Sequence, residues 1–254
     1  MKKLFICSLV MAMTMFALSC SDDSKENPQP SPSDVPAKVT NVKMDSKTGI
    51  LTWDKAKGAK YYELHYISRL LTGEKYLGDA EETNFATDED WKNTWHKYIV
   101  YAVNEAGKSE ASNVIEGIWL DGKTVLNTPE LKDFSVKDSV RVSTEGKKID
   151  SWAFTTVIDT KDENAKHLQI NATTYIKTDE YTSTSSKQGT YNLSKLEPIS
   201  GNTYSVVTFI PKNQDVLKIE FEIFTSAAIT LKEIAESPYA ESAMISKTVE
   251  PNKK

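Results

Sequence analysis

The fold of the N-terminal half is decided by three segments: Leu51-Thr52-Trp53-Asp54, Gly58-Ala59-Lys60-Tyr61-Tyr62-Glu63-Leu64 and Tyr98-Ile99-Val100-Tyr101-Ala102-Val103-Asn104-Glu105-Ala106-Gly107-Lys108-Ser109. In each of them apolar or aromatic side chains recur at every second position, which is the period of a half-buried β-strand. Turn residues separate such short runs along the chain. This pattern predicts an antiparallel β-sandwich over residues 36–118.

Together with Pro36-Ala37-Lys38-Val39-Thr40 at its start, this region resembles a fibronectin type III domain. The resemblance implies that Trp53 packs in the core against the next strand. Counting back from Asn104, the position of the family's corner tyrosine holds His96, with Trp95 beside it. A corner closed by a tyrosine hydroxyl is therefore not expected. Trp91 and Trp95 are expected either to cap the core or to present aromatic surface to a partner.

A second β-sandwich is predicted over residues 119–239, so the expected fold class is all-β. Strand-like runs lie near residues 123–126, 134–142, 152–158, 168–177, 190–193, 204–210, 217–225 and 229–234. The last two runs, which follow a long serine- and threonine-rich loop at residues 177–189, resemble the closing hairpin of jelly-roll carbohydrate-binding modules. An immunoglobulin-like sandwich is the alternative. Residues 240–254 are expected to form a tail that is frayed beyond Tyr239.

The first 19 residues read as a secretion signal: two lysines, then an uncharged apolar run too short to span a bilayer. The sequence Phe16-Ala17-Leu18-Ser19-Cys20 resembles a bacterial lipobox, which implies that Cys20 carries acyl chains such as palmitate. The following Ser21-Asp22-Asp23 resembles the surface-export signal of Bacteroidota lipoproteins. These resemblances imply an outer-membrane lipoprotein held by lipid at Cys20 and exposed at the cell surface. An ordinary signal peptide followed by an incidental cysteine is the alternative.

Residues 20–35 are acidic and then proline-rich, which favours an extended spacer between membrane and folded part. Removing residues 1–19 takes away Lys2 and Lys3 and no acidic residue, so the formal charge moves from −5 to −7. Arg69 and Arg141 are the chain's arginines. Such a chain lacks the basic surface that phosphate backbones require, which argues against nucleic acid as a partner.

The sequence offers no recognisable catalytic constellation, and we do not expect an enzyme. After processing, Cys20 would be the remaining cysteine, and His65, His96 and His167 are scattered without metal-ligand spacing or a paired nucleophile. A small glycoside-active enzyme using two carboxylates stays as a third hypothesis. No cofactor or metal is predicted. Four oxygen-bearing residues could hold calcium but lack the order of a calcium loop, so a solvated turn is expected there: Asp159, Asp162, Glu163 and Asn164.

A sugar-binding site would need aromatic faces for stacking and polar partners for hydroxyl groups. The candidates in the second sandwich are Trp152, Tyr175, Tyr181 and Tyr191, with packing in the core or against loops as the alternative for each. The sequence thus predicts a surface lipoprotein that binds a polysaccharide or oligosaccharide, as an accessory to an outer-membrane uptake system. The alternative is an adhesive or scaffold protein that docks a partner such as an outer-membrane protein.

Overall fold

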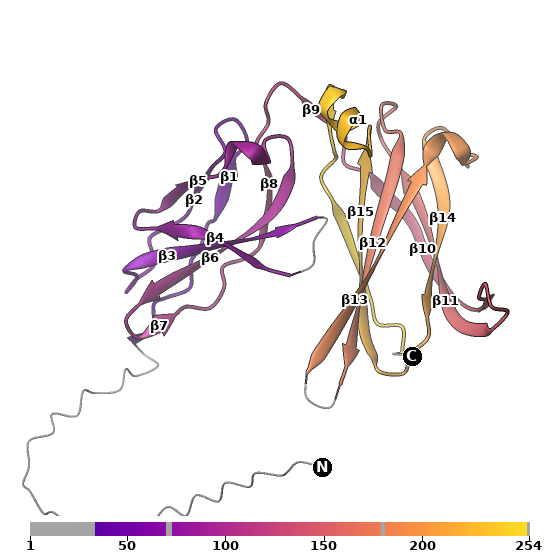
Figure 1. Cartoon of the computed structure of the whole chain (residues 1–254), viewed down its shortest axis with the longest axis horizontal. Coiled ribbons are helices and arrows are strands. Elements are labelled where there is room, and N and C mark those ends of the chain that lie inside the picture. The colour runs from indigo at the N-terminus through magenta and orange to yellow at the C-terminus, as the bar shows by residue number, and fades with distance from the viewer. Residues whose placement is uncertain (1–33, 70–72, 179–180, 253–254) are drawn as a thin grey trace, which may run out of the picture.

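The computed structural model describes residues 34–69, 73–178 and 181–252, and these form two β-sandwiches in series (Figure 1). The predicted signal, Cys20 and the tether as far as residue 33 lie outside the described residues. The all-β fold class predicted from the sequence is confirmed.

The first sandwich packs two sheets face to face. One sheet has the order β1 (Lys43–Asp45), β2 (Ile50–Thr52), β5 (Asn84–Ala86). The other has the order β4 (Lys75–Ala80), β3 (Tyr61–Ser68), β6 (Trp95–Asn104), with β7 (Gly107–Lys108) and β8 (Ile115–Ile118) both pairing with β6. Trp53 lies in the core and meets the ring of Tyr62 edge-on, with 5.3 Å between ring centroids. The packing implied by the fibronectin resemblance is therefore present.

The corner near His96 is closed by aromatic rings. His96 is buried and stacks on Trp91, which precedes it in the short 3₁₀ turn η2 (Glu89–Trp91), with ring centroids 4.3 Å apart and planes 17° apart. Tyr66 contacts both rings. Trp91 thus caps the core, which was one of its two predicted roles.

The segment that follows the first sandwich is packed against it. Trp119 covers the turn between β1 and β2, where Gly49 has φ +70° and an added Cβ would stand 2.4 Å from the Trp119 ring. Backbone hydrogen bonds from Leu120 to Ser46 and from Asn93 to Trp119 hold the same segment. Further on, β9 (Thr124–Val125) pairs in parallel with β16 (Tyr239–Ala240) of the second sandwich. The connection between the sandwiches is therefore fixed at both ends.

The second sandwich repeats the strand order of the first. Its sheets are β10 (Glu130–Val142), β11 (Lys148–Asp159), β14 (Thr203–Pro211), and β13 (Thr182–Asn192), β12 (His167–Lys177), β15 (Val216–Ser226), β17 (Ile245–Val249). When the main strands of each sandwich are counted along the chain, the first, second and fifth form one sheet. The fourth, third, sixth and last form the sheet that faces it. A jelly roll uses eight strands in two Greek keys, so the immunoglobulin-like alternative is the one observed.

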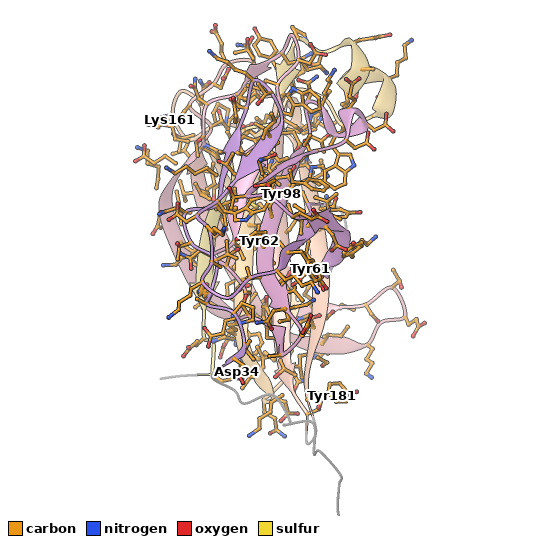
Figure 2. All side chains as sticks on the ribbon, turned by 90° about the vertical axis from the view of Figure 1, so that its left-hand side faces the viewer. Asp34, Tyr61, Tyr62, Tyr98, Lys161 and Tyr181 are labelled. Atoms are coloured by element: carbon orange, nitrogen blue, oxygen red, sulfur yellow. The ribbon has the colours of Figure 1, made fainter. Side chains whose placement is uncertain are left out.

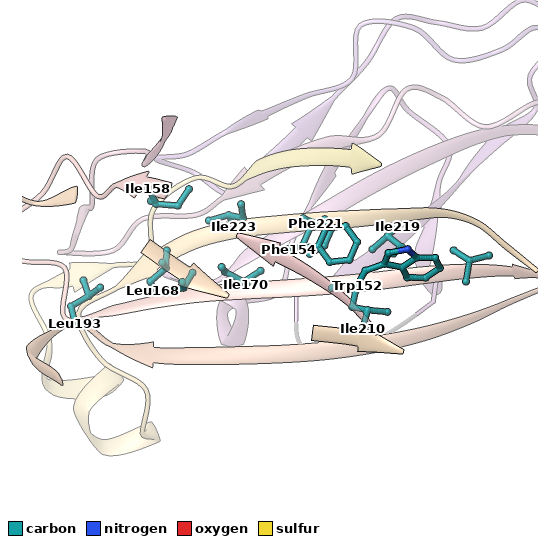
Figure 3. Close-up of a cluster of buried hydrophobic side chains, with 13 residues drawn as sticks. Trp152, Phe154, Ile158, Leu168, Ile170, Leu193, Ile210, Ile219, Phe221 and Ile223 are labelled. Atoms are coloured by element: carbon teal, nitrogen blue, oxygen red, sulfur yellow. The ribbon is translucent and has the colours of Figure 1, made fainter. Parts of the chain in front are cut away.

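The second core lies between these two sheets. Phe154 and Phe221 meet at its centre with ring centroids 4.9 Å apart, and Trp152 lies beside them (Figure 3). Inward positions of β12 and β15 alternate with outward polar positions, as expected for antiparallel sheets with one wet face. Leu193, in the 3₁₀ turn η3 (Leu193–Lys195), closes one end.

Three sequence predictions in this half are wrong. The expected loop at residues 177–189 is largely strand β13, whose hydroxyl side chains gave no apolar alternation because the strand lies at a sheet edge and is mostly exposed. The expected strand at residues 229–234 is instead helix α1 (Leu231–Glu236), because Thr230 and Glu233 form a capping box. The expected frayed tail, residues 240–254, contains the end of β16 and all of β17, and β17 completes the second sheet.

Candidate functional site

The two sandwiches meet around one buried arginine. The side chain of Arg69 is 4% exposed and donates through Nη2 to Glu116 at 2.8 Å and through Nη1 to Glu241 at 3.2 Å. Its guanidinium also lies between the rings of Trp95 at 5.0 Å and Phe224 at 4.6 Å. Glu116 and Trp95 belong to the first sandwich, while Glu241 and Phe224 belong to the second. Arg69 therefore joins the two units through charge, hydrogen bonds and stacking.

Polar side chains extend this junction across the face of the second sandwich. Trp95 Nε1 donates to the backbone oxygen of Glu241 at 2.8 Å, and Gln169 Nε2 donates to the Glu241 carboxylate at 3.4 Å. Gln188 then donates to Gln169 at 3.3 Å. Burial raises the pKa of Glu241 even though Arg69 acts in the opposite direction. Trp95 thus faces the second sandwich, in neither of the roles predicted for it.

A cleft of about 390 Å³ opens beside this junction. Its first wall is the end of β3 and β6, with Ile67, Ser68 and Lys97. Its second wall is the outer face of the sheet containing β12 and β13. Strand register places directly opposed side chains on the same face, and three such pairs line the cleft: Asn171 with Gln188, Thr173 with Ser186, and Tyr175 with Thr184. This wall offers amide, hydroxyl and phenol groups and no charge of its own on β12.

Most charged groups in the cleft are paired with one another, whereas Lys187 Nζ donates to the backbone oxygen of Phe209 at 2.9 Å. Lys97 forms an ion pair with Glu222 across the junction. Glu220 accepts hydrogen bonds from the Tyr175 hydroxyl at 2.7 Å and from Lys218 Nζ at 2.5 Å. Burial raises the pKa of Glu220, but the hydrogen bonds from Lys218 and Tyr175 outweigh it and leave that pKa below its usual value. Burial and the bond to Glu220 raise the pKa of Tyr175 to about 12.

The pair Glu220 and Glu222 is the arrangement that could have suggested a glycosidase. A general acid needs a carboxyl whose pKa is raised, so that it holds a proton near neutral pH. The pKa of Glu220 is instead lowered, and Glu222 is ion-paired with Lys97. Glu220 therefore suits hydrogen-bond acceptance better than proton donation.

Asn171 has an unused hydrogen-bond acceptor in this wall. Its Oδ1 is buried and receives no hydrogen bond from any described residue, although the residue lines the cleft. An unsatisfied buried carbonyl oxygen costs about 1–3 kcal/mol, and because less than 1 Å² of this atom is exposed, a ligand hydroxyl recovers that penalty once the amide turns toward the cleft. Asn171 is therefore our candidate for a ligand hydrogen bond in the cleft.

The structure does not bring the four predicted sugar-binding residues together. Tyr175 lines the cleft. Trp152 is a core residue, 6% exposed, and Tyr191 packs against the same core with its hydroxyl 3.3 Å from Thr208 Oγ1. Tyr181 is exposed near the turn between β12 and β13, at the lower end of the molecule in Figure 2.

The oxygen-rich turn after β11 is bonded internally. Asp159 pairs with Lys161 at 2.9 Å, while Asp162 accepts from the backbone N–H groups of Asn164 at 2.9 Å and Asn127 at 3.0 Å. Within residues 34–69, 73–178 and 181–252, no group of three or more histidine, cysteine or acidic side chains could hold a metal ion.

Part of the cleft could have been found from the sequence. In residues 168–177 the apolar side chains Leu168, Ile170 and Ala172 alternate with Asn171, Thr173 and Tyr175, so the outward row was readable once the strand was predicted. The wall formed by β3 and β6 of the first sandwich could not be predicted from the sequence. It depends on the docking of the first sandwich through Arg69, which no local pattern signals.

No protein-family model matches the chain, and no curated protein matches it either. Among solved structures, the chain is similar to a mutant of the fibronectin domain FN3tt, at 25% identity over 34% of this chain and 99% of that chain, with a TM-score of 0.27. It is similar to titin kinase with its flanking domains at 16% identity, over 48% of this chain and 29% of that one, with a TM-score of 0.28. It is also similar to the FN1–FN3 domains of chicken CNTN1 at 13% identity, over 85% and 68%, with a TM-score of 0.29.

The strand order of the two sandwiches is itself that of a fibronectin type III-like or immunoglobulin-like fold. Among the described residues, no helix combines the length and the apolar character needed to cross a bilayer.

Proposed function

We propose that this chain is a cell-surface lipoprotein that binds a glycan in the cleft between its two sandwiches. The observation that carries the proposal is the row of neutral hydrogen-bonding groups on β12 and β13, with the unpartnered Oδ1 of Asn171 among them. Sugars present many hydroxyl groups that both donate and accept, and such a row matches them. Tyr175 adds a phenol hydroxyl at the same wall, while Lys218 Nζ lies over its ring at 4.3 Å.

The N-terminal sequence supports the location. The lipobox-like segment ending at Cys20 and the acidic residues after it favour anchoring in the outer membrane, and the proline-rich tether would lift the sandwiches away from it. A glycan-binding protein in that position fits an accessory role in an outer-membrane uptake system. Acylation is testable by mass spectrometry of the native protein, and Cys20→Ala is expected to release it from the membrane fraction.

Binding is tested by affinity electrophoresis of the soluble chain beginning at residue 21. We expect retardation in gels containing one or more of β-glucan, xylan, mannan or starch. The variant Asn171→Ala should weaken that retardation about tenfold in apparent affinity, because it removes the free acceptor without breaking an internal hydrogen bond. Thr182→Ala, an exposed substitution outside the cleft lining, is the matched control. Retardation by none of these polysaccharides, or equal retardation of Asn171→Ala and the control, would contradict the proposal.

A partner protein is the second candidate, and a separate surface favours it. Strand β10 lies at the edge of its sheet and exposes Val136, Val140 and Val142 at 43%, 58% and 64%. Exposed apolar residues on an edge strand are suited to pairing with a strand of another protein. Capture of one stoichiometric outer-membrane protein by the wild-type chain, lost in Val140→Lys and without sugar binding, would favour this role.

A further inference from the structure

The polar cleft continues onto an aromatic surface of the first sandwich. Ile67 and Lys97, which line the cleft, are directly paired on β3 and β6. His65 is two residues before Ile67 on β3, so it lies on the same face about 7 Å further along the strand. Tyr76 of β4 pairs with His65, and their rings meet edge-on at 5.8 Å. The Tyr76 side chain therefore stands one strand repeat beyond the cleft wall.

Tyr76 has the character of a stacking platform. It is 56% exposed, and its contact with His65 is edge-on. Neighbouring Tyr101 differs, since Lys108 lies over its ring at 4.9 Å and its hydroxyl donates to Glu74. His65 is held in place by Glu74, with His65 Nδ1 lying 2.8 Å from Glu74 Oε1. The packed His65 and Tyr101 thus support the exposed ring of Tyr76.

The charges along this path disfavour an acidic ligand. Three cations near it are already paired: Arg69 with Glu116 and Glu241, Lys97 with Glu222, and Lys108 with Glu63. Carboxylates lie at both ends of the path from the cleft to Tyr76. Glu220 and Glu222 line the cleft, and Glu74 contacts His65, which packs against Tyr76. A uronic acid or sulfate group would meet these carboxylates at both ends, and among the described residues Lys187 of the cleft and exposed Lys75 beside Tyr76 are the nearby lysines that form no ion pair.

Resting on the proposed glycan-binding function, we infer that the ligand is a neutral oligosaccharide several sugars long, bound at one end by Asn171 in the cleft and stacked at the other on Tyr76. Asn171 and Tyr76 belong to different sandwiches, so one chain of sugars that contacts both residues bridges the two units. The fixed junction at Arg69 keeps the two contact regions at a constant separation, which reduces the entropy lost on binding.

The test compares a disaccharide with a hexasaccharide of the polysaccharide that retards the protein, by isothermal titration calorimetry. Tyr76→Ala is expected to weaken hexasaccharide binding about tenfold, since an aromatic stacking contact contributes about that factor. Binding of the disaccharide, which fits the cleft alone, should be unchanged. Tyr76→Phe keeps the ring and should bind like the wild type. Tyr181→Ala removes an equally exposed tyrosine outside the cleft and is the matched control.

The possible failures are distinguishable. If Asn171→Ala weakens both sugars but Tyr76→Ala binds the hexasaccharide normally, the cleft stands and the aromatic extension is wrong. If the wild-type chain binds neither sugar, both the proposed function and this extension fail. Tighter retention by hyaluronan, alginate or pectin than by neutral polysaccharides would overturn the assignment of a neutral ligand.

Discussion

At the scale of single residues, His96 shows how this chain accommodates a polar group in a core. Its ring stacks on Trp91, and its Nδ1 is buried without a hydrogen-bond partner in the described part of the chain. Burial, and to a smaller extent the charge of Arg69, lowers the pKa of His96. The imidazole is therefore held neutral by its surroundings, and the ring contributes mainly aromatic packing.

We expect His96→Phe to flatten the pH dependence of stability. Because the folded-state pKa of His96 is lowered, the unfolded chain takes up the proton first as pH falls below about 6.5. The stability contributed by the neutral ring is present above that pH and is lost under acidic conditions. In His96→Phe the fall in melting temperature of the first sandwich between about pH 7 and pH 5 should be smaller than in the wild type.

At about pH 8, where the wild-type ring is neutral in both states, His96→Phe should be as stable as the wild type or more stable by up to about 1 kcal/mol. The reason is that it removes an unpaired buried nitrogen while keeping an aromatic ring. Differential scanning calorimetry at both pH values measures both effects. An unchanged pH slope would show that another group governs it.

The sequence predicted the core positions of this region but could not predict their exact partners. Alternation places Tyr62 with Leu64, and Tyr98 with Val100, on one face of each strand, and all four are buried. The departure of His96 from the family's tyrosine was visible, so a different corner was expected. That the ring would stack on Trp91 depended on the path of the intervening turn, which has no periodic pattern to read.

At the scale of elements, the last strand shows where local patterns mislead. The segment after α1 has few apolar residues and ends in a polar stretch, which is why it was predicted to fray. In the structure Ile245 and Val249 pack against the second core, and β17 pairs with Ile219–Ile223 of β15. Ser242 is fully buried, and its hydroxyl accepts a hydrogen bond from the Thr225 backbone at 2.9 Å. These two apolar side chains are enough to hold β17 in place because β15 offers a strand edge for backbone hydrogen bonds.

We therefore expect a chain that ends at Ala240 to lose its second sandwich. Removal of β17 exposes the edge of β15 and one side of the core, and a domain stabilised by about 5–15 kcal/mol cannot absorb the loss of a whole strand. Calorimetry should show the transition of the first sandwich alone, and Trp152 fluorescence should indicate exposure to water. A chain ending at Asn252 is the control. A second cooperative transition in the shorter chain would show that β17 is dispensable.

At the scale of the whole molecule, the junction at Arg69 decides whether the two sandwiches behave as one body. The chain's other arginine, Arg141, is exposed and lies over Phe209. The two arginines therefore differ in burial and in their contacts. Sequence could place both on strands or turns but could not distinguish them, because the carboxylate partner Glu241 is 172 residues away from Arg69. The proposed binding site depends on this long-range contact, since it sets the opening of the cleft.

Arg69→Ala is expected to uncouple the sandwiches. It leaves Glu116 and Glu241 facing each other without a cation and removes the guanidinium that lies over both Trp95 and Phe224. Breaking a buried ion pair costs about 3–5 kcal/mol, and the low end applies because the Glu241 side chain keeps 31% of its surface exposed. Calorimetry should show two transitions more widely separated than in the wild type, small-angle scattering a larger radius of gyration, and sugar binding should weaken. Arg141→Ala should change none of these.

The pH dependence of the stability of Arg69→Ala shows whether the uncompensated charge of Glu241 causes the uncoupling. The pKa of Glu241 is raised by burial, so the folded state binds a proton more readily than the unfolded chain, and protonation removes the uncompensated charge. The penalty of Arg69→Ala should therefore be fully present near neutral pH and should shrink as pH falls toward the ordinary glutamate range. The double variant Arg69→Ala with Glu241→Gln should recover part of the coupling at neutral pH. If the double variant and acidification both leave the separation unchanged, the stacking of the Arg69 guanidinium on Trp95 and Phe224, rather than its ion pairs, holds the two sandwiches together.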